Sequence, residues 1–168
     1  MSIYCKAVPA AVIVAARPAQ RARRAGRAVV LTNFGYELGG VDGGVFFRKT
    51  PLFSVLERGS PLGAFTGTLE PQANDLIVTK KYLSAFHGTR LAQTFCQLGV
   101  DAPVIVGFSA SGCIRASALD GLQHGFIPFV ARDACADQHA DPHEANLFDL
   151  QAKYAEVVWF TEATAIFG

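Results

Sequence analysis

The sequence predicts an α/β protein, a three-layer Rossmann-like fold in which helices flank a mostly parallel β-sheet. From residue 75 to residue 160, short apolar stretches alternate with helical patterns of about 10 to 15 residues, which is typical of βαβ units. The 168 residues also contain no internal repeat and no low-complexity linker. We therefore expect one domain over residues 1–168, with ligands bound at the carboxyl ends of its strands.

The first 75 residues have a less regular pattern. Residues 10–25 have a helical pattern that Pro18 interrupts, and Gly26 is suited to end this helix before an apolar strand at residues 28–34. Residues 39–61 lack a clean periodicity, so we expect an excursion from the fold there. Its Gly-rich beginning lacks the Lys-Ser/Thr ending of a phosphate-binding P-loop.

The pattern becomes regular from residue 75 onward. Asp141, Pro142 and Glu144 are typical of the N-cap, the first turn and the capping-box partner of a helix that ends at Tyr154. The other expected helices cover residues 88–98 and 112–124, and the expected strands cover residues 75–80, 103–108, 127–133 and 156–160.

Charge and cysteine usage exclude several classes of protein. A net charge of +1 gives no electrostatic case for nucleic acid or an anionic membrane as a partner. The four cysteines include no C-x-x-C pair, so we expect free thiols in a reducing, cytoplasmic compartment. Six basic residues precede the first acidic residue, Glu37, and they fit the solvated face of a surface helix better than a targeting peptide.

A candidate nucleophile lies between an apolar strand and a helix, in residues 104–118. Cys113 follows small residues at the expected helix start, where unpaired N–H groups favour a thiolate and can hold a developing oxyanion. The alternative is a buried, inert cysteine. Lys80 ends another expected strand, so the parallel architecture can bring its ammonium group close to the thiol, although a surface lysine is the simpler interpretation.

Two further patterns carry less weight. His139 and His143, with Asp137 and Asp141, form the His/Asp cluster of the chain, but their spacing does not match a structural zinc site. Helix capping and solvation are the simpler roles for them, and we expect neither a metal nor another cofactor. No G-x-S-x-G motif supports serine hydrolysis, and no G-x-G-x-x-G follows a strand to support the alternative of a dinucleotide-binding protein.

Several motifs together resemble those of the isochorismatase-like cysteine hydrolases, and within that family the N-carbamoylsarcosine amidohydrolase branch. The resemblance covers most of the chain. It rests on VTKKYLSAFHGT at residues 78–89, GFSASGCIRA at 107–116, DGLQHGF at 120–126, RD at 132–133 and PHEANLFD at 142–149.

The resemblance implies an Asp-Lys-Cys triad that hydrolyses a small amide or N-carbamoyl compound. Cys113 matches the nucleophile that attacks the carbonyl, releases ammonia and forms a thioester, and Lys80 matches the lysine. A cis peptide bond is implied at Phe108–Ser109, and the backbone N–H groups of Gly112 and Cys113 are expected to form the oxyanion hole. Family members are often dimers or tetramers, so a homo-oligomer is expected.

One departure from the family concerns the aspartate. In the family this residue ends a first strand, whereas this chain has no acidic residue before Glu37. The sequence is therefore expected to be N-terminally incomplete, with a gap in the middle of a six-stranded sheet. The alternative function is a catalytically inactive relative that acts as a binding or assembly module.

A second departure concerns the substrate. Gln138 stands where the carbamoylsarcosine-like members have an arginine that binds the substrate carboxylate. A neutral amide cannot replace the paired, charge-assisted hydrogen bonds of a guanidinium group. An N-carbamoyl amino acid is therefore disfavoured as the substrate, and Ser109 and Gln138 are expected to line the pocket.

Overall fold

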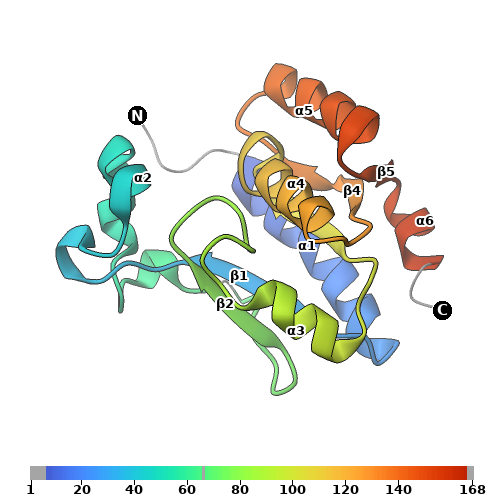
Figure 1. The fold of residues 1–168 in the computed structure, drawn as a ribbon, viewed down its shortest axis with the longest axis horizontal. Coiled ribbons are helices and arrows are strands. Elements are labelled where there is room, and N and C mark those ends of the chain that lie inside the picture. The colour runs from blue at the N-terminus through green and yellow to red at the C-terminus, as the bar shows by residue number, and fades with distance from the viewer. Residues whose placement is uncertain (1–6, 66, 166–168) are drawn as a thin grey trace.

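The computed structural model describes residues 7–65 and 67–165, which form two small parallel sheets with helices on both sides (Figure 1). Short 3-10 turns lie between β1 and β2, and a π-helical turn, η4 (Ala110–Ile114), precedes α4. The helices and strands are α1 (Ala7–Arg24), β1 (Val30–Phe34), α2 (Gly44–Lys49), β2 (Leu76–Lys80), α3 (Leu91–Leu98), β3 (Val104–Phe108), α4 (Arg115–Gln123), β4 (Phe129–Ala136), α5 (Ala140–Lys153), β5 (Glu156–Val158) and α6 (Phe160–Ala165).

Every strand ladder is parallel, which confirms the predicted fold class. β1 pairs with β2 from Val30↔Leu76 to Phe34↔Lys80, and β4 lies between β3 and β5. Within the described residues, no ladder joins β1 to β3, so the sheet is divided into a two-stranded and a three-stranded part. All residues of β3 are only half-buried, as expected for a strand with one unpaired edge.

The three-stranded part carries helices on both faces. Val130 and Ala131, neighbours in β4, are both fully buried and point to opposite faces. Val130 packs in one cluster with Ile114, α4 and α5, whereas Ala131 packs in another with Ala163 of α6 and Val14 of α1. These clusters make the three layers of the fold.

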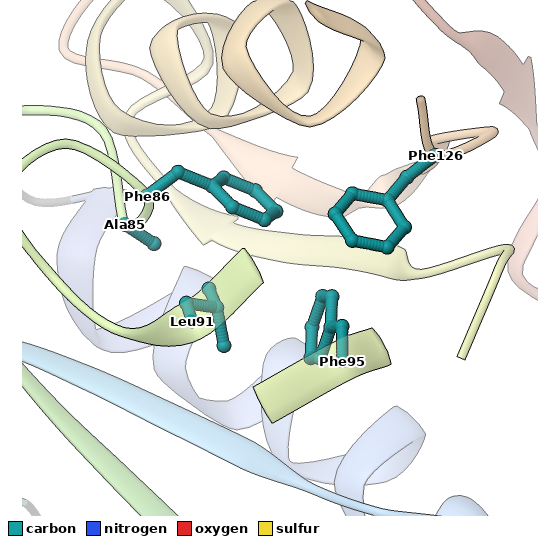
Figure 2. Packing of buried hydrophobic residues seen from close by; sticks show 5 residues of the cluster. All are labelled: Ala85, Phe86, Leu91, Phe95 and Phe126. Atoms are coloured by element: carbon teal, nitrogen blue, oxygen red, sulfur yellow. The ribbon is translucent and has the colours of Figure 1, made fainter. Parts of the chain in front are cut away.

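An aromatic cluster on the α3 side packs against the two-stranded part (Figure 2). The Phe126 ring lies 5.7 Å from that of Phe86 and 5.5 Å from that of Phe95, centre to centre. Val30 and Val78 of β1 and β2 pack against the same cluster. Because Phe126 precedes β4, this cluster links the two parts of the sheet.

All four predicted helices differ in detail from the structure: α3 begins at Leu91 rather than at residue 88, and α4 begins at Arg115 rather than at residue 112, because the π-helical turn η4 precedes it. α1 continues through Pro18, whose ring is buried, and the neighbouring Ala15 and Ala22 are buried as well. The packing of this face of α1 offsets the loss of the backbone hydrogen bond that a proline cannot make. α5 begins after an extended His139 rather than at Asp141, which lies in its first turn, and no side chain caps this helix.

Two strands and the excursion also differ from the prediction. β4 extends to Ala136 because extra residues in β4, between Val130 and Cys135, shift the register and let the ends of β3 and β4 pair again. β5 ends at Val158, since the Phe160 N–H donates to the Asp133 carboxylate at 2.7 Å and the chain turns into α6 there. The excursion of residues 39–61 contains the short helix α2. No helix in the described ranges is both long and apolar enough to cross a membrane.

Candidate active site

Lys80 and Cys113 lie together at the carboxyl ends of their strands. Lys80 is the last residue of β2, and Cys113 lies in the turn η4 that follows β3. The Lys80 Nζ donates a hydrogen bond to the Cys113 Sγ at 3.1 Å. Lys80 is only 3% exposed, so it is not the surface lysine that was the simpler interpretation of the sequence.

The Lys80 ammonium group has three further neighbours. It donates to the carbonyl oxygens of Tyr82 at 3.3 Å and Leu83 at 2.9 Å, and it lies 3.6 Å from the centre of the Phe34 ring. Burial lowers the pKa of Lys80 below its ordinary value of 10.5, and the charge of the Cys113 thiolate opposes this shift. Within the described residues, no carboxylate pairs with Lys80.

The loop that follows β2 is held in place from α4. The buried Ser117 hydroxyl accepts the Ala85 N–H at 3.0 Å, and the Ser84 hydroxyl accepts the Phe86 N–H at 3.1 Å. The aromatic cluster of Figure 2 anchors the same loop through Phe86. The carbonyl groups around the Lys80 ammonium group therefore belong to a fixed loop.

The turn that carries Cys113 begins at the Phe108–Ser109 peptide bond, which is cis. The Ser109 carbonyl accepts the N–H groups of Gly112 and Ile114, both at 3.1 Å. A side chain at Gly112 would place its Cβ 2.6 Å from the Ser109 Oγ, so a larger residue there would force the Ser109 hydroxyl to move. The Gly112 N–H is therefore used inside the turn, whereas the Cys113 N–H takes part in neither of these two bonds.

An aromatic wall lies beside the lysine and the thiol. The fully buried Tyr36 donates its hydroxyl to the Lys81 carbonyl at 2.9 Å, and its ring lies 4.8 Å from that of Phe47. Burial raises the pKa of Tyr36 to about 12. The Phe34 ring lies 4.9 Å from that of Phe53. Sequence reasoning missed this wall, although Phe34 ends a predicted strand on the side where ligands bind.

Asp137, which the sequence placed only in the His/Asp cluster with a capping or solvation role, lies beside the nucleophile turn. It is 8% exposed and follows β4 directly. Its carboxylate accepts the Ser111 N–H at 2.6 Å and the Gln138 N–H at 2.7 Å. Gln138 itself is exposed. The neighbouring histidines form no metal site: the described residues include no group of three or more His, Cys, Asp or Glu arranged to hold a metal ion.

Two surface cavities lie away from this site. One, of about 580 Å³, lies between α1 and residues 67–72, and the other, of about 330 Å³, lies between β2 and the start of α3. Neither is lined by Lys80 or Cys113. The chemistry of the side chains, rather than the depth of a cavity, therefore marks the candidate site.

The chain is similar to known proteins over most of its length. Residues 4–162 match the isochorismatase domain. Maleamate amidohydrolase of Pseudomonas putida is 47% identical over 93% of this chain and 74% of its own length. N-carbamoylsarcosine amidase of an Arthrobacter species is 27% identical over 69% of this chain and 44% of its own length. The chain thus spans about three quarters of the first relative and less than half of the second.

Solved structures share the fold at lower identity. The cysteine hydrolase from Pseudomonas syringae has a TM-score of 0.92 at 23% identity, covering 98% of this chain and 83% of its own. The isochorismatase family protein from Desulfovibrio vulgaris has a TM-score of 0.89 at 24% identity, covering 97% of this chain and 87% of its own. The match of the domain and the identity to an amidohydrolase confirm the resemblance, and the chain belongs to the isochorismatase-like cysteine hydrolase family.

Proposed function

We propose that this chain hydrolyses a small amide or N-carbamoyl compound through a thioester on Cys113. The observation that carries the proposal is the buried Lys80 Nζ at 3.1 Å from the Cys113 Sγ. A nucleophile and a group able to exchange its proton are thereby within hydrogen-bond distance. The relatives named for cleavage of maleamate and N-carbamoylsarcosine support amide chemistry.

In this proposal, Lys80 carries the proton through both halves of the reaction. Transfer of the Cys113 thiol proton to the Lys80 amine gives the pair of ammonium group and thiolate, and the thiolate sulfur then forms a bond to the substrate carbonyl carbon. When the C–N bond breaks, the Lys80 ammonium group gives that proton to the departing amine. Water then attacks the thioester, Lys80 accepts a proton from it, and the proton returns to the sulfur as the C–S bond breaks. The lowered pKa of Lys80 suits a group that must both accept and donate.

The developing oxyanion needs donors in the turn. We assign this role to the backbone N–H groups of Gly112 and Cys113, of which the Gly112 N–H also donates to the Ser109 carbonyl. Ser109 and Gln138 are proposed to line the substrate pocket. Lys80 and the aromatic wall beside it favour a compact, planar acyl group over a bulky one.

The test is turnover by the purified chain of maleamate, N-carbamoylsarcosine and nicotinamide, with ammonia and the carboxylate product measured. We expect one of them to be hydrolysed, an acyl adduct on Cys113 by mass spectrometry, and loss of turnover in Cys113→Ala and Lys80→Met. Cys96→Ala is the matched control, because Cys96 is exposed on α3. Turnover that persists in Cys113→Ala overturns the proposal.

A chain that folds but consumes none of these amides supports the alternative of an inactive relative with a binding role. The rate of alkylation by a thiol reagent also distinguishes an active hydrolase from an inactive relative. Activation by Lys80 requires Cys113 to be alkylated faster than Cys96 near neutral pH. Equal rates at the two cysteines count against an activated thiol.

We further propose that the chain is a single domain that forms a homo-oligomer in the cytoplasm. Cys96, Cys113 and Cys135 are free thiols, which suits a reducing compartment. Leu38 and Val41, just before α2, are 78% and 81% exposed, and α2 stands apart from the layered helices (Figure 1). We assign this apolar surface to contact with a second copy. A monomeric mass of the chain by light scattering at micromolar concentrations contradicts the assignment.

A further inference from the structure

We infer that Asp137 is a positioning residue for the nucleophile: its carboxylate holds the turn η4 so that Cys113 faces Lys80 and the Cys113 N–H faces the substrate. This inference rests on the proposed role of Cys113. Asp137 carries no role in the chemistry described above, yet it is a buried carboxylate in contact with the backbone two residues before the nucleophile. Such a group requires a physical explanation, because burying a charge is costly unless hydrogen bonds compensate it.

The strand register places Asp137 beside the start of the turn. Phe108 and Ala136 are ladder partners at the ends of β3 and β4. The next residues, Ser109 and Asp137, therefore leave the sheet side by side, one into the turn and the other alongside it. The Asp137 Oδ2 accepts the Ser111 N–H at 2.6 Å, a short charge-assisted bond that ties the turn to the end of β4.

The same contacts indicate how Asp137 acts. Its two oxygens are each occupied by a backbone N–H, from Ser111 and from Gln138. The charged group that shifts the pKa of Lys80 is Cys113 rather than Asp137. A carboxylate engaged in this way acts through the turn, and it is not placed to exchange a proton with the thiol.

Packing holds the end of the turn, because Ile114 is 3% exposed and lies in one cluster with Val130 of β4. The Gly112 and Ile114 N–H groups both donate to the Ser109 carbonyl, so these bonds close the turn on itself without fixing it to the sheet. The bond from Ser111 to Asp137 adds a hydrogen bond from the middle of the turn to the end of β4. Its loss allows the turn to rotate, which alters both the Lys80–Cys113 contact and the direction of the Cys113 N–H. Misplacement of a reacting group by about 1 Å is enough to lower a rate by roughly a hundredfold.

The test compares Asp137→Ala, Asp137→Asn and the control Asp133→Asn in the full chain. Asp133 is also on β4 and its carboxylate also accepts a backbone N–H at 2.7 Å, but that N–H belongs to Phe160 at the start of α6. Two rates are measured for each variant: turnover of the amide that the wild-type chain consumes, and alkylation of Cys113 by iodoacetamide as a function of pH.

We expect Asp137→Ala to lower kcat by about tenfold or more, with a smaller change in KM, and to lower the rate of Cys113 alkylation at neutral pH. Asp137→Asn retains an oxygen that can accept the Ser111 N–H and is expected to recover part of both rates. Asp133→Asn is expected to leave both unchanged. Circular dichroism identifies a variant that has failed to fold, and in that case Asp137→Asn decides the question.

Two outcomes separate this inference from the proposed function. If the wild-type chain turns over no amide while Asp137→Ala still changes the pH profile of Cys113 alkylation, the proposed function fails and the positioning role stands. If kcat and the alkylation profile of folded Asp137 variants both match those of the wild type, Asp137 is not a positioning residue. A drop in melting temperature alone, with both rates retained, likewise overturns the inference.

Discussion

The Phe34 ring lies beneath the Lys80 ammonium group, with 3.6 Å between the ring centre and Nζ. Phe34 ends β1, and Lys80 is its partner at the end of β2. An ammonium group over an aromatic face is stabilised by the negative potential of the ring. This pair therefore helps to keep a charged group inside the protein, beside the Cys113 thiol.

Replacing Phe34 with leucine removes this contact and leaves a small void. We expect the free energy of unfolding to fall by about 1–3 kcal/mol, from the lost cation–π contact and the poorer packing. Urea denaturation measures it. Phe148→Leu is the matched control, since Phe148 is 75% exposed on α5, and its stability is expected to change by less than about 0.5 kcal/mol. Equal losses in the two variants contradict a specific role for the ring.

Lys80 makes stability depend on pH in a defined direction. Its pKa in the folded chain lies below the ordinary value of 10.5, so in the window between these two values the unfolded chain binds more protons. The free energy of unfolding therefore rises with pH in that window. The comparison is between Cys113→Ala and the double variant Cys113→Ala/Lys80→Met, so that the thiol does not titrate in either chain. We expect the difference in their free energies of unfolding, measured by urea denaturation, to increase with pH in favour of the chain that keeps Lys80. If this free-energy difference stays constant or falls as the pH approaches 10.5, burial is not the dominant influence on the pKa of Lys80.

Ser117 anchors the loop that surrounds Lys80. Ser117→Ala leaves the buried Ala85 N–H without its acceptor, and we expect a loss of about 1–3 kcal/mol in the free energy of unfolding. Ser60→Ala removes the same kind of bond, to the Leu62 N–H, from an exposed turn and serves as the control. The prediction is wrong if thermal or urea denaturation finds Ser60→Ala to be the more destabilised variant.

The other cysteines differ in reactivity because of their burial. Burial raises the pKa of Cys135 to about 12, so it stays a neutral thiol at pH 8. Cys96 is exposed. With a disulfide reagent at pH 8 and peptide mass spectrometry, we expect Cys96 to be modified in the native chain and Cys135 only after denaturation. Modification of Cys135 in the native chain at the rate of Cys96 refutes this prediction.

The divided sheet predicts a pattern of hydrogen exchange. β4 pairs with a strand on each side, whereas β1 and β3 each pair on one side within the described residues. We expect the β1 and β3 amides that point away from their ladders to exchange much faster than those of β4. Amide-resolved exchange followed by NMR measures this. Equal protection throughout β1, β3 and β4 shows that the open edges are covered in solution.

Particular residues show how far sequence reasoning reached. The apolar residues of 76–78 and 104–106 and the helical patterns between them were enough to predict the α/β class, because alternating elements of these lengths have few packing solutions. The end of β5 could not be predicted: the Phe160 N–H is taken by Asp133, a residue 27 positions earlier. The interruption expected at Pro18 was wrong because burial of that face supports the helix.

The sequence by itself determined the parallel α/β class, the family, and the residue types of the candidate site, since these depend on local patterns and short motifs. Tertiary structure alone decided that the Lys80 ammonium group is buried against Cys113 and Phe34, that the Gly112 N–H is used within its own turn, and that Asp137 holds that turn. Contacts of this kind join residues far apart along the chain. They depend on strand register and on the packing of side chains between layers, and neither can be read from the local pattern of one segment.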